Sequence, residues 1–405
     1  MANGLVAAGA RVTAVTASRE VFLVRYGADE DLESAINDQI RLVRVPFFPE
    51  KAWPQLNDWS FKRAEQPSSY SAHNDPALAH FPEVVYAPWL SRVHSALIDL
   101  HHADPIDLLL ATGSPYVDLQ AASLVGSDFQ IPTILDDRDA FVLDVFTGEH
   151  HDYYKQRLPF FVEWLAQCKE MWFVNPPIAT KHQEAFPEYA DKIKVVENGW
   201  DDGVVVPHKM SATPHQKLRA AYVGLLPTNF PFEDVFGAWI DAVGQATDID
   251  DLQCIGPLGF EIGSPGWVRA EKAITAADRV AWFGHVPRQE LATVYADLDV
   301  LMFVKAGGAM VTGGKTYEYL ATGLPIVALV DQNSDALRVF EGYPRLHVAD
   351  YHDREASVAA IRSAVADRRS GDEAALHAAQ KFGAKLSRAH HLQPDLERIV
   401  AMVQR

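Results

Sequence analysis

The chain has 405 residues, and its 54 Asp and Glu side chains outnumber 36 Lys and Arg, which gives a formal net charge of -18. Hydrophobic residues make up 48% and charged residues 22%, which excludes a disordered or fibrous chain and predicts two or three globular domains. The acidic balance argues against nucleic acid or anionic lipid as the main partner, although a small phosphate ligand needs only a local site.

Cys168 and Cys254 are the only cysteines. They exclude a disulfide framework and a cysteine-based zinc site. The sequence shows neither a long uninterrupted apolar run nor a signal-peptide pattern. We therefore expect a cytoplasmic protein without an integral membrane segment.

Short β-branched apolar runs alternate with amphipathic segments along the chain. This alternation predicts parallel sheets that are covered by helices on both faces. The expected strands are 12–16, 108–111, 133–135, 171–174, 194–196, 220–223, 252–255, 280–283, 300–304 and 326–330. The expected helices are 87–101, 118–124, 160–169, 233–243, 288–296, 356–366 and 393–403.

These elements predict an α/β fold with two Rossmann-like, doubly wound parallel-sheet domains that face each other across a cleft. The N-terminal domain covers residues 1–175 and is expected to bind the acceptor. Residues 176–202 connect it to a C-terminal domain over 203–385, which is expected to bind the donor. Residues 386–405 are predicted to form a helix that packs back on the first domain.

The beginning of the chain departs from the usual order of a doubly wound domain. Residues 1–9 are typical of the end of an amphipathic helix, and the first expected strand follows at 12–16. Such a domain normally opens with a strand and a Gly-rich turn, so we expect that the first strand is missing and that the natural polypeptide begins upstream of Met1. Residues 28–80 show little periodicity and predict a loop-rich insertion.

The segment 300–330 carries the most chemistry. An apolar strand leads into a loop with Gly313 and Gly314, and a short helix follows. The N–H groups at the start of this helix favour phosphate, and Lys315 adds a cation. Glu318 lies about one turn further on the same face, where its carboxylate suits the two hydroxyls of a ribose.

Two other interpretations of this segment remain. Lys315 and Glu318 can instead form a solvated pair, while the glycines only shape a loop. Gly314, Lys315 and Thr316 also end like a Walker A motif, but that motif requires Gly at the position of Ala309. The shifted spacing argues against a P-loop.

The run from Lys315, KTYEYLATGLPIVA, resembles the donor-site signature of retaining GT-B glycosyltransferases of the family-4 type, also called glycosyl transferases group 1. Four other segments resemble this family in the same order along the chain. They are 134–139 (ILDDRD), 196–201 (VENGWD), 221–224 (AYVG) and 280–291 (VAWFGHVPRQEL).

The resemblance implies transfer of a sugar from a nucleotide-sugar donor to a carbohydrate, lipid-linked or small-molecule acceptor, with retention of anomeric configuration. It needs neither a metal nor a cofactor besides the donor, because the helix end and Lys315 hold the diphosphate. The expected catalytic residues are Lys315, Glu318 and Asp139. The expected donor site contains Gly224, Gly284, His285, Thr312, Gly313, Gly314, Lys315, Thr316 and Glu318. The expected acceptor side contains Ser114, Asp137, Arg138, Asp139 and Asn198.

The chain departs from the family pattern at two positions. Met310 stands where many members have a first Glu, eight residues before Glu318, and Leu225 stands where many have an Arg. Lys305 is the candidate for a second cation. These departures leave open a non-catalytic protein that binds nucleotide-sugars or acts as a scaffold, and a nucleotide-sugar epimerase of related fold.

Overall fold

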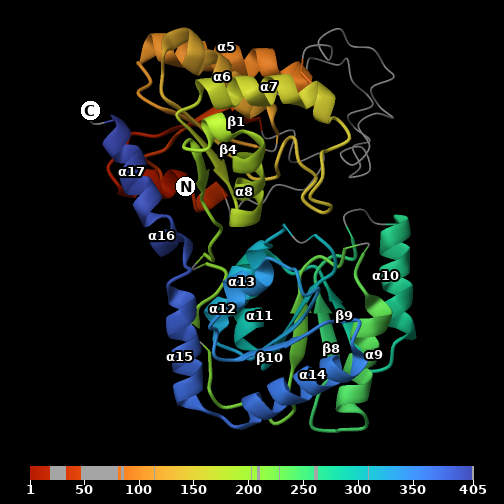
Figure 1. The fold of residues 1–405 in the computed structure, drawn as a ribbon. Helices are drawn as coiled ribbons and strands as arrows, with labels where there is room; N and C mark the ends of the chain where they lie inside the picture. Colours follow the sequence, from red (N-terminus) through yellow and green to blue (C-terminus); the bar gives the residue numbers. More distant parts are fainter. Residues whose placement is uncertain are drawn as a thin grey trace. The chain divides into compact units, whose positions relative to one another are not determined.

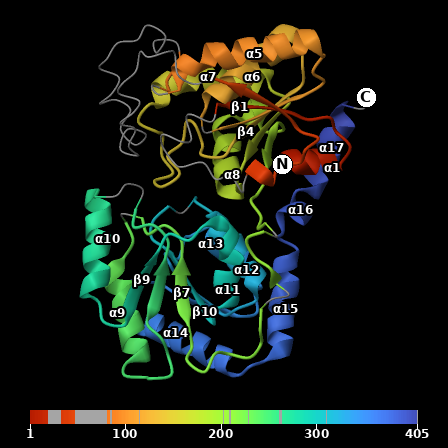
Figure 2. The ribbon, with the colours of Figure 1, turned by 180° about the vertical axis from the view of Figure 1, so that it is seen from behind.

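The computed structural model describes residues 1–18, 33–46, 81–83, 86–113, 115–201, 203–207, 210–227, 229–259, 263–308 and 310–403. The chain divides into two compact units. Unit 1 contains Met1–Glu197 together with Leu392–Arg405, and unit 2 contains Asn198–His391. Figure 1 shows the ribbon of both units and their element labels, and Figure 2 shows it from behind. Both units contain parallel β-sheets and helices, as the sequence predicts.

The described residues of unit 1 form two separate parallel sheets. One has four strands in the order β3-β4-β5-β6, and the other pairs β1 with β2. Among the described residues, no strand joins the two sheets. The bounds are β1 Thr13–Ala17, β2 Arg41–Val45, β3 Leu109–Gly113, β4 Thr133–Asp137, β5 Glu170–Phe173 and β6 Ile193–Val195.

The C-terminal helix of the chain belongs to unit 1. Leu396 and Ile399 of this helix are buried in a cluster with Ile134 and Trp172 of the sheet, and Leu5 of the first helix packs against that cluster. The helices of unit 1 are α1 Ala2–Ala7, α5 Leu90–Ala103, α6 Val117–Phe129, α7 Tyr154–Gln167, α8 Pro176–Ala185 and α17 Gln393–Val403, with 3-10 turns η4 Ala87–Trp89 and η5 Pro187–Tyr189.

Unit 2 contains one sheet of six parallel strands. Its order is β12-β11-β10-β7-β8-β9, so β7, β8 and β9 lie on one side of β10 and β11 and β12 lie on the other, as in dinucleotide-binding folds. The order reverses between β7 and β10, which is where such sheets bind ligands. The bounds are β7 Ala220–Val223, β8 Leu252–Ile255, β9 Val280–Gly284, β10 Val300–Lys305, β11 Ile326–Val330 and β12 Leu346–Ala349.

Helices cover both faces of this sheet. Val300, Met302 and Val304 of β10 are buried under α9 and α14, whereas Leu301 and Phe303 are buried on the other face with residues of α12 and α13. This two-residue alternation explains the continuous apolar runs of the strands. The helices of unit 2 are α9 Phe232–Val243, α10 Pro265–Ala276, α11 Leu291–Ala296, α12 Gly314–Thr322, α13 Ala336–Phe340, α14 Arg354–Arg369, α15 Glu373–Ala384 and α16 Arg388–His391, with the 3-10 turn η7 Arg288–Glu290.

The division between the units differs from the predicted connection over 176–202. Much of that segment folds as α8 and β6 within unit 1. Pro176 and Pro177 do not interrupt the fold, because they occupy the first turn of α8, where a missing N–H costs nothing. Asn175 caps this helix by accepting a hydrogen bond from the N–H of Ile178 at 3.1 Å.

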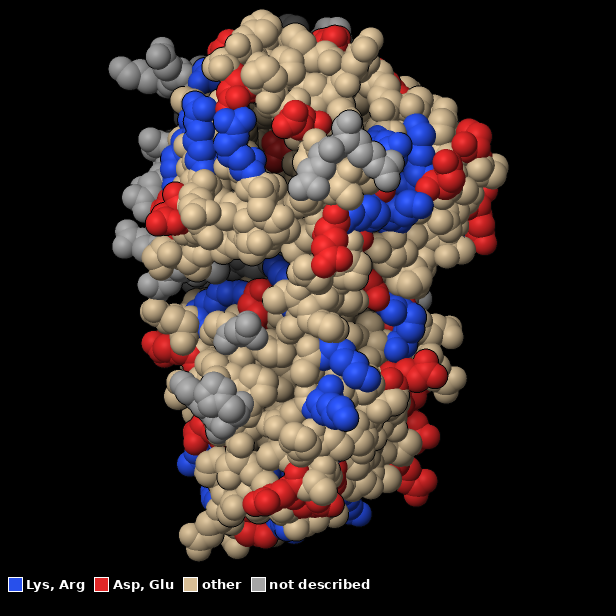
Figure 3. All heavy atoms as spheres, turned by 90° about the vertical axis from the view of Figure 1, so that its left-hand side faces the viewer, with Lys and Arg blue, Asp and Glu red and all other residues tan. Residues whose placement is uncertain are grey.

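The described residues include no helix that is long and apolar enough to cross a membrane. On the face drawn in Figure 3, Lys and Arg side chains form small groups among Asp and Glu side chains. This face therefore lacks the continuous basic surface that nucleic-acid binding requires.

Candidate functional site

The candidate site lies at the carboxyl ends of β7 and β10, where the strand order of unit 2 reverses. Gly224 follows β7, and the loop after β10 leads to α12. That loop is held by its neighbours, since the N–H of Gly307 donates to Asp331 at 2.6 Å and Asn229 donates to the carbonyl of Ala306 at 2.8 Å. The fold therefore brings Gly224 together with the predicted phosphate loop.

Gly224, Gly256 and Gly284 lie at the ends of three neighbouring strands, and together they form a surface without side chains that we call the glycine floor. The N–H of Gly224 donates to Ile255 and that of Gly256 donates to Gly284, both at 2.7 Å. Their φ angles are 153°, 140° and 74° for Gly224, Gly256 and Gly284, which side chains disfavour. A Cβ on Gly256 would lie 2.1 Å from the carbonyl oxygen of Gly224. Two of these glycines were predicted, and Gly256 was not.

Lys315 lies directly on this floor. A Cβ on Gly224 would lie 2.3 Å from Cε of Lys315 and 3.2 Å from its Nζ, so the lysine occupies the space that the glycine leaves. Burial lowers the pKa of Lys315, the nearby Arg288 lowers it further, and Glu318 raises it. The structure thus brings two predicted donor residues into contact although they are distant in sequence.

The start of α12 offers backbone donors. Gly313 is its N-cap residue, and the described residues contain no acceptor for the N–H groups of Gly314 and Lys315. The N–H of Thr316 instead donates to the carbonyl of Gly313 at 3.1 Å. Two of the expected phosphate donors are therefore open, and the Thr316 N–H is already used.

Thr312 and Thr316 have buried side chains. The hydroxyl of Thr312 donates to the carboxylate of Asp335, which is also paired with Arg338 at 2.9 Å. That contact anchors the loop to the start of α13. The hydroxyl of Thr316 is buried and has no hydrogen-bond partner among the described residues.

Glu318 is held by a tyrosine from another helix. Its Oε2 accepts a hydrogen bond from the hydroxyl of Tyr295 at 2.9 Å. Tyr295 is fully buried, whereas Glu318 is half-buried. Burial raises the pKa of Tyr295, and the Glu318 carboxylate raises it further. The Tyr295 hydroxyl therefore stays protonated and donates to Glu318. The alternative in which Glu318 and Lys315 only form a solvated pair does not include this contact.

Arg288, in the turn after β9, was not predicted as a site residue. It forms an ion pair with Asp201 at 2.7 Å, and Asp201 also pairs with Arg388 at 3.3 Å. The charge of Arg288 acts on both Lys315 and Tyr295. This cation therefore belongs to the same electrostatic environment as the predicted phosphate site.

Exposed groups lie at the end of β9. Trp282 and Phe283 are 42% and 57% exposed, and His285 after them is exposed as well. The indole N–H of Trp282 donates to the carbonyl of Gly256 at 2.8 Å, which ties this edge to the glycine floor. The predicted contact of His285 with the nucleotide stays a prediction.

The predicted acceptor residues belong to different units of the chain. Asp137 is fully buried, and both its carboxylate oxygens accept from the N–H of Phe141, at 2.9 and 3.0 Å. Arg138 pairs with Asp136 at 2.9 Å, and Asp139 is exposed. Ser114 lies outside the described residues, and Asn198 belongs to unit 2, where its carbonyl hydrogen-bonds His391 at 2.9 Å. Asp137 therefore has a structural role as a loop cap.

Unit 1 also contains a group of acids with raised pKa values. The carboxylate of Glu83 accepts from the N–H groups of Tyr116 and Val117 at 3.0 and 2.9 Å, at the start of α6. Burial raises the pKa of Glu83 to about 7 and that of Asp118 to about 8, and the Glu83 charge raises the latter further. The folded state therefore binds more protons than the unfolded state between about pH 4 and pH 8.

Protonation of these acids makes the stability depend on pH. The stabilisation is complete below the unfolded-state pKa of about 4 and is lost as the pH rises through the folded-state values. We expect Asp118→Asn, which is neutral at every pH, to raise the thermal midpoint relative to wild type at pH 8.5 but not at pH 5. Thermal unfolding across this range checks this, with Asp99→Asn on the exposed side of α5 as the control. A difference between Asp118→Asn and wild type that does not change with pH would contradict it.

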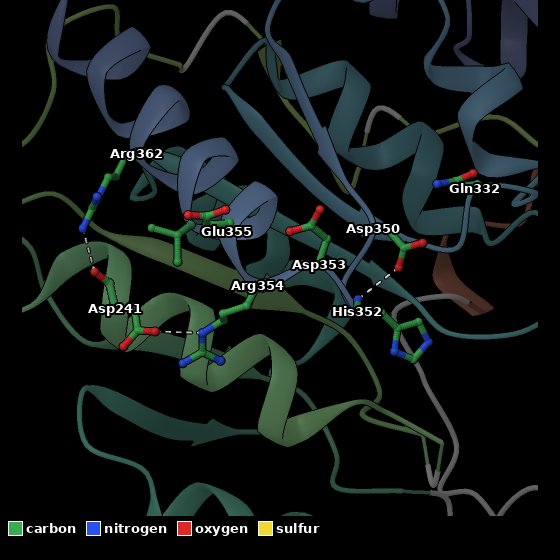
Figure 4. A pocket seen from close by; sticks show the side chains of 9 residues that line it. Asp241, Gln332, Asp350, His352, Asp353, Arg354, Glu355 and Arg362 are labelled. Atoms are coloured by element: carbon green, nitrogen blue, oxygen red, sulfur yellow. Dashed lines mark hydrogen bonds and ion pairs between the residues drawn. The ribbon is translucent and has the colours of Figure 1, made fainter.

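Another part of unit 2 forms a wide pocket of about 820 Å³, and Figure 4 shows the side chains that line it. Its two arginines are already engaged with α9. Arg354 pairs with Asp241 at 2.9 Å and Arg362 donates to the carbonyl of Asp241 at 2.8 Å. These contacts fasten α14 to α9.

Among the described residues, no group of three or more His, Cys, Asp or Glu side chains is arranged to hold a metal ion.

Comparisons of the sequence with known proteins find no match, whereas comparisons of the structure do. No family model matches the sequence, and no curated protein matches it. Solved structures do match, over the whole chain, and they establish the fold as GT-B, the fold of a class of glycosyltransferases.

Three solved structures illustrate the likeness. Sucrose-phosphate synthase from Thermosynechococcus elongatus has a TM-score of 0.62 and 13% identity, over 100% of this chain and 91% of that chain. Anabaena Alr3699/HepE in complex with UDP and glucose has a TM-score of 0.61 and 14% identity, over 96% and 99%. A putative UDP-N-acetylglucosamine 2-epimerase from Listeria monocytogenes has a TM-score of 0.51 and 12% identity, over 98% and 96%.

Proposed function

We propose that this protein is a retaining glycosyltransferase of the family-4 type that transfers a sugar from a nucleoside diphosphate to an acceptor hydroxyl without a metal ion. One observation carries the proposal. Lys315 and Glu318 lie one helical turn apart on α12, and Lys315 lies against Gly224 at the point where the strand order reverses. The UDP and glucose bound by the structural neighbour from Anabaena support a nucleotide-sugar donor.

The reaction breaks the bond between the anomeric carbon and the phosphate oxygen. The acceptor oxygen forms the new bond to that carbon, and its proton passes to a phosphate oxygen. Negative charge grows on the leaving diphosphate, so the protein mainly stabilises that charge and aligns the acceptor. The N–H groups of Gly314 and Lys315 and the ammonium of Lys315 supply the positive environment that a divalent cation supplies elsewhere.

Arg288 supplies a second cation in this proposal. The family often places an arginine directly after the glycine of the first strand, where this chain has Leu225. The charge of Arg288 reaches Lys315 from the turn after β9, and this replaces Lys305 as our candidate for the second diphosphate contact. The pairing of Arg288 with Asp201 holds the guanidinium in place.

Glu318 binds the ribose and Asp139 acts on the acceptor side in this proposal. Asp139 is exposed and directly follows Arg138, which carries the opposite charge. An exposed acid beside an arginine can orient the hydroxyls of a carbohydrate. A nucleotide-sugar donor also agrees with the cytoplasmic location that we infer from the two cysteines.

The proposal is tested by incubating the purified protein with a panel of nucleotide-sugars and analysing the products. Release of a nucleoside diphosphate, with the sugar hydrolysed or transferred with retained configuration, is the expected result. A sugar that changes configuration while still linked to its nucleotide indicates the epimerase, which the likeness to the Listeria protein keeps as the second candidate. Binding without turnover across donors and acceptors indicates the non-catalytic alternative.

A further inference from the structure

Tyr295 joins two helices at the candidate donor site. It lies in α11, and its hydroxyl reaches Glu318 of α12 at 2.9 Å. A phenol whose neighbour is an ionised carboxylate can only donate to it, and a carboxylate can only accept. One oxygen of Glu318 is therefore committed to Tyr295, and Oε1 retains capacity for other donors.

The position of Tyr295 is fixed by packing. Its ring meets the ring of Tyr319 edge to face, with centroids 6.1 Å apart and an interplanar angle of 76°. The hydroxyl of Tyr319 accepts a hydrogen bond from the N–H of Val223 in β7 at 2.8 Å. Both tyrosines are buried to 99% or more. Glu318 is therefore held by a rigid chain of contacts that reaches the central strand.

We propose that Tyr295 is a positioning residue that aims the Glu318 carboxylate at the ribose hydroxyls of the donor nucleotide and so makes the site selective for ribonucleotides. This inference rests on the proposed function. A half-buried glutamate that rotates freely would lose side-chain conformational entropy when it accepts hydrogen bonds from the two ribose hydroxyls, and this loss would weaken binding. The bond to Tyr295 removes part of that cost before the ligand arrives.

The chemistry predicts a specific pattern of selectivity. A ribose presents two hydroxyl donors to Glu318, and a 2′-deoxyribose presents one fewer. A hydrogen bond to a charged group contributes about 1.5–3 kcal/mol, which corresponds to roughly 10–100-fold in affinity. Loss of the Tyr295 hydroxyl should therefore weaken ribonucleotide binding more than deoxyribonucleotide binding.

Calorimetry with UDP and 2′-deoxy-UDP tests the inference on the full chain. Wild type should prefer UDP by about 10-fold or more, and Tyr295→Phe should reduce this ratio to about 3 or less. Tyr295→Phe keeps the ring that packs on Tyr319. Tyr343→Phe is the matched control, because it also removes a buried hydroxyl of unit 2, one that donates to the carbonyl of Leu324 at 2.7 Å, and it should keep the wild-type ratio.

The outcomes separate this inference from the proposed function. If Tyr295→Phe weakens both ligands equally, or keeps the full ratio, the positioning role is wrong although the donor site stands. If wild type binds neither ligand nor any other nucleoside diphosphate, the proposed function fails first. In a Glu318→Ala background, Tyr295→Phe should not change the affinity for UDP, and a further loss of UDP affinity there would overturn the role.

Discussion

Replacing Lys315 with Met should weaken the binding of a nucleoside diphosphate by about 10–100-fold while changing the binding of the nucleoside little. The expected size is that of a hydrogen bond to a charged group in a half-buried site. Met retains the aliphatic stem that packs on Gly224 and removes only the ammonium, so the variant should fold normally. Calorimetry with UDP and uridine measures both affinities.

The same lysine should make diphosphate binding depend on pH. Burial lowers its pKa, so its charge is present below that lowered value and is lost at a less alkaline pH than for an ordinary lysine. Wild-type affinity for UDP should fall as the pH rises towards that value, and Lys315→Met should lack this fall. Lys272→Met on the exposed side of α10 is the control. Equal affinities of wild type and Lys315→Met for UDP would remove Lys315 from the site.

Replacing Gly256 with Ala should destabilise unit 2 by roughly 3 kcal/mol or more. The new Cβ would lie 2.1 Å from a carbonyl oxygen of the backbone, and the φ of 140° disfavours a side chain. The chain has little freedom to move apart there, because Gly224 and Gly256 both donate to the neighbouring strand at 2.7 Å. Urea unfolding measures the change in free energy.

Gly313→Ala is the matched control for this substitution. Gly313 has a φ of -75°, and a Cβ there would meet nothing within 4 Å, so we expect a change below about 1 kcal/mol. Gly313 also lies at the candidate phosphate loop. A loss of stability in Gly256→Ala alone is therefore not a general effect of adding a methyl group near that loop. If both variants unfold at the same urea concentration, the glycine floor is not the rigid contact described here.

Much of the fold was predictable where strands are buried on both faces, as β7 and β11 are. The runs at β7 and β11 are continuous and apolar, and the predicted bounds of β7, β8 and β11 agree with the structure. β2 was missed since its sequence, RLVRV, carries two arginines within a segment predicted as a loop-rich insertion. β12 was missed because its sequence, LHVA, contains a histidine and only its last residue, Ala349, is buried. The rest of the predicted insertion, over 47–80, lies outside the described residues.

The candidate site was predictable only where it is local. Gly314, Lys315 and Glu318 occur within one turn of a helix, so their spacing alone indicated their relation. Tyr295 and Arg288 could not be found in this way, because tertiary packing brings them to Glu318 and Lys315. Gly256 could have been suspected, because it directly follows a strand just as Gly224 does.

A crystal structure of the protein with UDP bound tests the central claim most directly. Our account predicts the diphosphate at the start of α12 beside Lys315 and Gly224, with both ribose hydroxyls on the carboxylate of Glu318. A nucleotide bound elsewhere, or bound there with its ribose turned away from Glu318, would contradict it.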